Sequence, residues 1–463
     1  MKSLPWLKIP LACLLVALAV ASLIVPVKAV LTDGTVHDIS SLGAGSPDIE
    51  ISSNGNFIAV TYYKQSNGEG PVYVKSADSA GGWVTATFVG TGSDPQLAFQ
   101  SGVNNVVYVV WRKAGGAAIA SAKCTLVSAT APNCSVGADV RTVSTDQLNF
   151  PDVAVTNSGI VHVVWQNSTG PGVTQIETAR STAATNVSAW NAPVTVAGSG
   201  VNRKPVLTFG NGLLHLAFLN GSSTSILTQV RYYQSSNGSS WSNPKNFRLG
   251  TEIIGGTAHD TLDNPAIAVS SNNVYLAWDA HRNGSSDYSL LQATSTAADG
   301  SSWPANASYA PSGTAATSNP TAEVKSSTTL SLPPQQVGLR PSLAISNTTP
   351  VIAWQEIPGQ VGCAAVTPFF YIFRVSPLTG IADYSTEFLQ NQGDDDEMID
   401  VDLAIGSSGV HQVFMRDNNV TSCPPPNGAN GYLITYRGPF INRGNDAGEG
   451  GNGVFLPIIQ KSS

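Results

Sequence analysis

Charged residues are scarce in this chain. Asp, Glu, Lys and Arg together make up 11% of its 463 residues, whereas about 25% is usual in a globular protein. The Lys and Arg residues are scattered, with never more than two together, and the formal net charge is −7. We therefore expect no nucleic-acid partner, because no basic stripe is present to neutralise phosphates.

Cysteine is rare as well, with five residues. Cys13 lies in an N-terminal apolar run, and the residues before it make a poor lipidation site. The other four cysteines suit an oxidising compartment, in which thiols pair. Four free thiols are the alternative.

The N-terminus has the features of an export signal. Lys2 and Lys8 give a positive start, an apolar run follows over residues 9–27, and small residues lead to Ala29. We expect cleavage after Ala29, which makes residues 1–29 a signal peptide and the protein secreted or attached to the cell surface. Because the apolar run is long, its retention as a membrane anchor is the alternative.

A two-strand signature recurs along the rest of the chain. Its first half is Pro followed by alternating apolar residues, and its second half is an apolar run that ends in an aromatic residue. Asn and Gly between the halves predict tight turns, so each copy forms a hairpin. Both strands are nearly continuously apolar, which indicates burial on both faces. The seven copies begin at Pro47, Pro95, Pro151, Pro205, Pro265, Pro341 and Val401.

Two more strands follow in each unit, and a polar turn leads to a Trp that starts the outer strand. The clearest example is Thr228–Tyr233 followed by Trp241, and Trp83, Trp190 and Trp303 stand in similar turns. Units of four strands at a spacing of about 50 residues predict an all-β, seven-bladed β-propeller of four-stranded antiparallel blades.

The last unit lacks a clear fourth strand. The segment Thr35–Ile39 precedes the first unit, and we expect it to supply that strand and close the ring. The propeller domain then covers residues 30–440, with a Ser-, Thr- and Pro-rich insertion at 310–336. A Gly- and Asn-rich linker at 441–453 and an apolar tail at 454–463 follow. We expect a monomer that contacts a membrane only through an uncleaved signal or this tail.

The repeat also guides the pairing of the cysteines. Cys363 and Cys423 each lie nine positions after the aromatic residue that ends a second strand, in neighbouring units. Equivalent loops of neighbouring blades lie side by side, so we expect these two residues to form one disulfide. Cys124 and Cys134 are expected to join the third and fourth strands of the second blade.

The turn from Ser76 through Asp78 to Trp83 resembles the Asp-box (BNR repeat) of the sialidase-like β-propeller superfamily, and the other Trp turns are degenerate versions of it. The resemblance implies the fold and says little about activity, because Asp-boxes brace turns away from the active face. In that family three arginines clamp the substrate carboxylate. Arg340 and Arg203 are the nearest matches, but neither stands in the family motif. The sequence has no Gly-x-Ser-x-Gly motif either, so we assign no catalytic residue.

The loops that enter each first strand should ring one mouth of the central channel. Their mixed polar residues predict a site for neutral or zwitterionic ligands such as sugars, although ordinary loop polarity is the alternative. The candidate ligand-binding residues are Asp94, Arg203, Lys204, Asp260, Asp263, Arg340 and Asp400.

Metal and histidine chemistry receive less support. His162, His215 and His411 occupy one repeat position, three residues before the terminal aromatic, and are therefore expected to be structural. The acidic run containing Asp394, Asp395 and Asp396 suggests a Ca²⁺ site, with a solvated loop as the alternative. We expect no other cofactor.

The leading functional hypothesis is an extracellular or cell-surface binding protein that takes glycan or protein ligands on its loop face. The first alternative is a sialidase-like glycoside hydrolase or lyase, and the second is a structural envelope component. A pair of carboxyl groups at the channel mouth would favour the hydrolase.

Overall fold

The computed structural model describes residues 30–32, 35–41, 43–64, 68–78, 82–100, 102–224, 226–248, 253–254, 257–282, 288–303, 322–325, 336–346, 349–357, 372–377, 387–389, 397–406, 409–417, 432–443 and 454–455. The predicted signal peptide, the acidic run Asp394–Asp396 and the pair Cys363 and Cys423 lie outside these ranges. In the part described, no helix is long and apolar enough to span a membrane.

The seven predicted hairpins are present, and each contributes one strand to the centre of the molecule. These inner strands are β3 (Ala44–Ile51), β6 (Thr87–Phe99), β11 (Gln147–Val155), β15 (Val201–Gly210), β20 (Thr257–Val269), β24 (Gln336–Ser346) and β28 (Glu397–Gly406). Their antiparallel partners are β4 (Phe57–Lys64), β7 (Val106–Lys113), β12 (Val161–Gly170), β16 (Leu213–Ser223), β21 (Val274–Arg282), β25 (Thr349–Ile357) and β29 (Gly409–Asp417).

A third strand pairs with each hairpin on the outer side. These strands are β5 (Gly70–Asp78), β8 (Ala118–Val127), β13 (Val173–Arg180), β17 (Ile226–Ser235), β22 (Tyr288–Thr294), β26 (Ile372–Pro377) and β30 (Tyr432–Arg443). Beyond them lie the first half of β6, β9 (Thr130–Val136), β10 (Arg141–Thr142), β14 (Val194–Ala197), β18 (Ser242–Arg248), β23 (Ala322–Lys325), β27 (Glu387–Leu389) and β2 (Thr35–Asp38).

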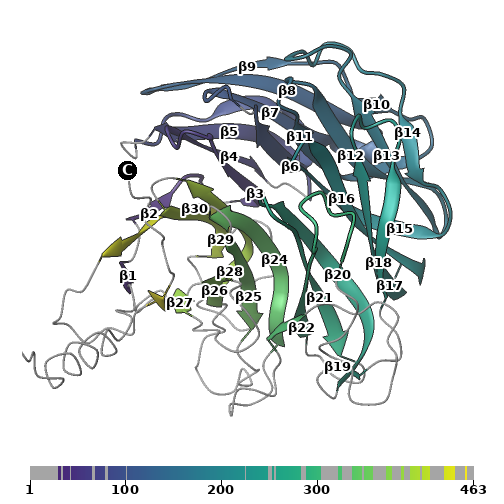
Figure 1. Cartoon of the computed structure of the whole chain (residues 1–463). Coiled ribbons are helices and arrows are strands. Elements are labelled where there is room, and N and C mark those ends of the chain that lie inside the picture. Colours follow the sequence, from purple (N-terminus) through teal and green to yellow (C-terminus); the bar gives the residue numbers. More distant parts are fainter. Residues whose placement is uncertain are drawn as a thin grey trace, which may run out of the picture.

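The inner strands form a closed ring. Each contacts the next in chain order, and β28, the last, contacts β3, the first. Figure 1 shows the strands near the C-terminus (yellow) beside those near the N-terminus (purple). Nearly all strand pairs are antiparallel, and the described part contains a single three-residue 3-10 turn, η1 (Ala114–Gly116). The prediction of an all-β propeller is therefore confirmed.

The core lies between neighbouring sheets. The aromatic residues that end the second strands, among them Trp111, Trp165, Trp278 and Trp354, are almost completely buried. They pack against the apolar face of the adjacent hairpin.

The three histidines belong to this packing. All are buried, His215 Nδ1 lies 2.6 Å from the Tyr232 hydroxyl, and His411 Nδ1 lies 2.6 Å from the Tyr436 hydroxyl. Burial favours the neutral ring and lowers the pKa of His411 and of His162 to about 4. The structural role expected from the repeat fits these contacts.

The Trp turns are braced by hydrogen bonds to their own glycines. The Trp303 indole donates to the Gly300 carbonyl at 2.8 Å, and Trp241 donates to Gly238 at 3.2 Å. Gly300 has φ +72°, and a Cβ there would lie only 2.0 Å from the Tyr232 hydroxyl. Glycine is therefore required at this position by both conformation and space.

β2 lies beside β30, in antiparallel register from Thr35 opposite Gly438 to Asp38 opposite Thr435. The Ile39 amide donates to the Ile434 carbonyl at 2.8 Å, and the buried Ile39 side chain packs in the cluster that contains Ile434. The expected N-terminal strand is thus paired with the last unit.

Two segments differ from their sequence-based boundaries. β23 lies within the predicted insertion at 310–336 and pairs with β22, because the short alternating segment Ala322–Lys325 suits a strand. β30 continues to Arg443, into the predicted linker, where it pairs with β1 (Val30–Thr32). β31 (Val454–Phe455), from the apolar tail, pairs with the other side of β1.

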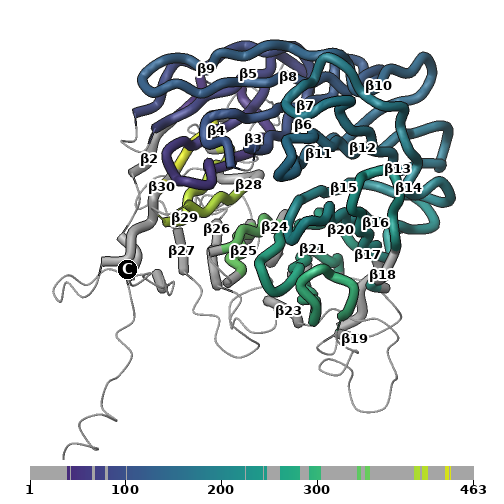
Figure 2. The backbone as a smooth tube through the Cα atoms, turned by 45° about the horizontal axis from the view of Figure 1, so that its top comes forward, coloured from purple at the N-terminus to yellow at the C-terminus, as the bar shows by residue number. Residues whose placement is uncertain are grey.

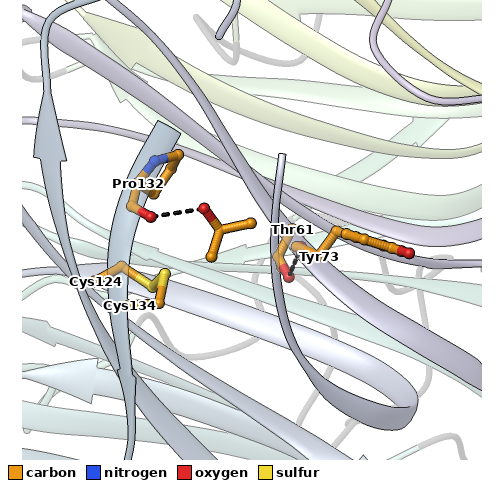
Figure 3. The surroundings of a disulfide bond; sticks show 6 residues. Thr61, Tyr73, Cys124, Pro132 and Cys134 are labelled. Carbon is orange, nitrogen blue, oxygen red and sulfur yellow. Dashed lines mark hydrogen bonds between the residues drawn. A yellow bond between two sulfur atoms is a disulfide. The ribbon is translucent and has the colours of Figure 1, made fainter. Parts of the chain in front are cut away.

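The disulfide between Cys124 and Cys134 joins β8 to β9, as predicted from the repeat. Figure 3 shows the bridge beside Pro132, whose carbonyl accepts a hydrogen bond from the Thr87 hydroxyl at 2.6 Å. The outer strands of the first two hairpin units are therefore held together near the bridge.

Replacing both Cys124 and Cys134 with Ala should lower the free energy of unfolding by up to about 3 kcal/mol, because the bridge closes a short loop in the unfolded chain. Denaturant unfolding of the variant and of the native chain measures the loss. A reducing agent should destabilise the native chain and leave the variant unchanged; an equal response of both proteins would contradict this prediction.

Candidate functional site

One cavity of about 540 Å³ opens at the centre of the ring, and residues from all seven inner strands line it. Figure 2 shows these strands around a common centre. The volume lies within the range of small-molecule sites. Its lining residues come from one repeated stretch of each inner strand, centred on the first residue of the repeat signature. We call this residue the anchor; it is Pro in six copies and Val401 in the seventh.

A β-bulge lies at the anchor in every inner strand. The register of each hairpin shifts at the same place, for example between Gly45 and Asp48 and between Arg203 and Val206. The bulge turns the residue before the anchor toward the cavity mouth. Five such residues have positive φ, between 44° and 50°, which is costly for any residue other than glycine; they are Ser46, Asp94, Phe150, Lys204 and Asn264.

The first residue after the anchor ties neighbouring inner strands together. Asp48 accepts a hydrogen bond from the Leu97 amide at 2.5 Å, and Asp152 accepts one from the Leu207 amide at 2.6 Å. In the same way, Asp402 accepts from the Ile49 amide at 2.9 Å, which links the last inner strand to the first.

A serine performs this task between the sixth and seventh inner strands. The Ser342 hydroxyl donates to Asp402 at 2.6 Å and accepts from the Leu403 amide at 3.1 Å. We call Asp48, Asp152, Ser342 and Asp402 the latch residues. Three of the four bring a carboxyl group to the cavity wall.

Glu50 lies in β3 two residues beyond Asp48 and three residues after the anchor. It lines the cavity and remains accessible to solvent. The same position in the other inner strands carries only small side chains: Ala98, Ala154, Thr208, Ala268, Ala344 and Ala404. Among these seven equivalent positions, only the one in β3 therefore carries a carboxyl group, and the repeat does not explain it.

The surroundings hold several of these carboxyl groups in the protonated form. Enclosure by the ring raises the pKa of Glu50 to about 8, and the negative charges of Asp402 and Asp152 add to the shift. Burial also raises the pKa of Asp152 to about 7, against the opposing effect of its amide donors. For Asp48, burial and the neighbouring Asp402 raise the pKa well above its ordinary value.

These shifts predict that stability falls as the pH rises from about 6.5 to 8. In that window the folded chain holds protons on Glu50 and Asp152 that the unfolded chain has lost, so unfolding is favoured by raising the pH. At lower pH the buried histidines act in the opposite direction, because their folded pKa is lowered.

Melting temperatures measured from pH 6.5 to 8 test this dependence. Replacing Glu50 with Ala, the residue found in most equivalent positions, should flatten the decrease. A native melting temperature that rises across this range, or an identical slope in the variant, would contradict the assignment.

A second group of contacts surrounds Asp94 at the mouth. Arg112 lies 3.9 Å from Asp94 Oδ2 and 2.8 Å from Glu69 Oε1. Burial raises the pKa of Asp94, although a hydrogen bond from Ser93 and the charge of Arg112 lower it. The guanidinium group of Arg112 thus lies between two acidic side chains at the mouth.

The predicted rim residues have different positions. Asp94, Lys204 and Asp263 line the cavity. Arg203 does not line it, because its Nη1 donates to the Thr224 carbonyl at 2.7 Å. Asp260, Arg340 and Asp400 lie in described strands, but their side chains are outside the described part of the molecule.

Sequence reasoning missed Glu50 and the latch carboxylates. A signal was present, since an Asp follows the anchor at positions 48, 152 and 402. Among the described residues, no group of three or more His, Cys, Asp or Glu side chains is arranged to hold a metal ion.

No family model and no curated protein matches the chain. Among solved structures, it is similar to an α-L-arabinanase from Penicillium chrysogenum, with 11% identity, 88% of this chain and 98% of that chain covered, and a TM-score of 0.46. It is also similar to the polysaccharide lyase Uly1 (10% identity, coverage 89% and 97%, TM-score 0.47) and to the sialidase from Trypanosoma rangeli (11%, 81% and 58%, 0.44). At such identities the likeness concerns the fold, and the chemistry has to come from the residues of this chain.

Proposed function

We propose that the cavity cleaves glycosidic bonds, with Glu50 as the acid that protonates the leaving oxygen. The observation that carries this proposal is a carboxyl group that keeps its proton at neutral pH and faces an accessible cavity. An acid with a pKa of about 8 is protonated at pH 7 and can still release its proton to a departing oxygen. Polar groups together with an aromatic and small apolar side chains in the wall suit a sugar ligand.

Asp152 is the proposed base. As the bond between the anomeric carbon and the glycosidic oxygen breaks, the Glu50 proton passes to that oxygen. A water molecule attacks the anomeric carbon and gives its proton to Asp152, which a pKa of about 7 leaves partly ionised at neutral pH. Proton exchange with solvent then restores both groups, and the nearby Asp402 adds to the enclosure that raises the pKa of Glu50.

A binding protein without catalytic activity is the second candidate. It is favoured by the hydrogen bonds of Asp48, Asp152 and Asp402 to backbone amides of neighbouring strands. These bonds give all three carboxyl groups a structural role, which would leave Glu50 without a catalytic base. In this second case a glycan would bind at the mouth and leave unchanged.

A panel of neutral and acidic oligosaccharides separates the two candidates. The purified chain is incubated with each compound, and new reducing ends and direct binding are both measured. Cleavage supports the hydrolase, binding without cleavage supports the second candidate, and neither would contradict both.

The finer architecture and the location belong to the same proposal. We infer seven four-stranded blades, with β2 completing the last, and support comes from the seven inner strands and the β2–β30 pairing. We also infer export through residues 1–29, which the disulfide between Cys124 and Cys134 supports because such bonds persist in oxidising compartments.

A further inference from the structure

The cavity mouth over β11, β15 and β20 carries an aromatic ring and three polar groups close together. Lys204 Nζ lies 2.7 Å from Asp263 Oδ1 and 2.7 Å from Asn264 Oδ1. It also lies 5.9 Å from the centroid of the Phe150 ring. All four residues line the cavity, and we call them the rim cluster.

The rim cluster is fixed in place before any ligand arrives. Phe150, Lys204 and Asn264 occupy the bulge position with positive φ in three successive inner strands. The side-chain Nδ2 of Asn264 donates to Asp279 at 2.8 Å, and the backbone amide of Asn264 donates to Asp263 at 2.9 Å. Such fixed groups lose little freedom on binding, which favours affinity.

Charge distinguishes between possible sugars. The Lys204 ammonium is already paired with Asp263, and 24% of its side chain and 39% of that of Asp263 remain exposed. The other ionisable groups in the described lining are all carboxyl groups: Asp48, Glu50, Asp94, Asp152 and Asp402. A sugar carboxylate would find no unpaired cation among the described lining residues, whereas hydroxyl groups could bond to both members of the Lys204–Asp263 pair.

Depth determines which part of a glycan can reach the acid. Glu50 is four residues further along its strand than the bulge residue Ser46, which corresponds to about 13 Å of extended chain. Its level is enclosed by the ring of inner strands. A chain end can enter such a space, whereas the middle of a long polymer would have to fold back on itself.

We propose that the rim cluster binds an uncharged glycan near its end, where the chain enters the cavity. One apolar face of a sugar ring stacks on Phe150, and its hydroxyl groups bond to Lys204, Asp263 and Asn264. This proposal rests on the proposed function only for the reaction at Glu50. Binding at the rim cluster does not require cleavage.

The test measures binding by calorimetry to the mature chain carrying Glu50→Gln, so that no ligand is consumed. The probes are neutral pentose and hexose oligosaccharides, and oligogalacturonate and sialyllactose as acidic counterparts. We expect the neutral compounds to bind and the acidic ones to bind at least tenfold more weakly. Acidic compounds binding equally well or better, or no binding of any neutral compound, would overturn the proposal.

Adding Phe150→Ala should weaken neutral binding by about tenfold or more, as expected for a central aromatic contact. Phe88→Ala is the matched control, since Phe88 is 55% exposed on the outer strand of the first unit and outside the cavity lining. If Phe150→Ala fails to fold, Phe150→Leu and Asn264→Ala replace it. Unchanged affinity in folded rim variants overturns the proposal, whereas binding without cleavage by the native chain overturns only the proposed function.

Discussion

Replacing Glu50 with Gln should reduce the rate of glycosidic cleavage by about 10²- to 10⁴-fold, the usual contribution of a positioned acid. Gln has nearly the same size but no proton to give to the leaving oxygen. The fold should be unaffected, because the equivalent position in the other inner strands tolerates small side chains. Neutral oligosaccharides should bind the variant as they bind the native chain.

The pH profile gives an independent measure of the same group. In the native chain, activity should fall above a pH of about 8 as Glu50 loses its proton, and this decrease should be absent from the residual activity of the variant. Asp139→Asn is the control, since Asp139 forms an exposed ion pair with Lys113 and does not line the cavity. Full activity in the Glu50 variant would remove this residue from the mechanism.

Deleting residues 30–41 should destabilise the fold by several kcal/mol and cause aggregation. The deletion removes β2 and Ile39, leaving the β30 backbone as an exposed edge that can pair with other chains. It also uncovers the cluster around Ile434, and loss of one buried Ile alone costs about 2–5 kcal/mol. A typical domain has only about 5–15 kcal/mol of stability in total.

Denaturant unfolding and light scattering measure both effects. Removing only residues 30–34 is the matched control, because it eliminates β1 and keeps β2 with its β30 partners. Ile39→Ala should give an intermediate loss. If the variant lacking residues 30–41 unfolds at the same denaturant concentration as the native chain, the ring does not need this strand.

Local patterns predicted the hairpins, the Trp turns and the pairing of Cys124 with Cys134. Each of these depends on residues close in sequence, or on a position repeated from unit to unit. The bulges were not predicted, because a register shift depends on how a strand packs within the ring, and their residue types share no chemical property.

The carboxyl groups of the cavity could likewise be predicted only in part from the sequence. Asp48 and Asp402 are 354 positions apart in the chain, and only closure of the ring brings the latter to the Ile49 amide. The sequence could indicate that an acidic residue follows the anchor in several copies. It could not reveal that enclosure by the other strands of the ring raises the pKa of Asp152 and of Glu50.

The repeated bulge separates recognition from folding. Ser, Asp, Phe, Lys and Asn all adopt the same backbone conformation at this position, each at a cost on the order of 1 kcal/mol. The ladder hydrogen bonds of the flanking hairpin therefore impose the conformation, whatever side chain is present. An engineer could exchange rim residues one at a time and redirect the cavity to new ligands, while the scaffold keeps almost the same melting temperature.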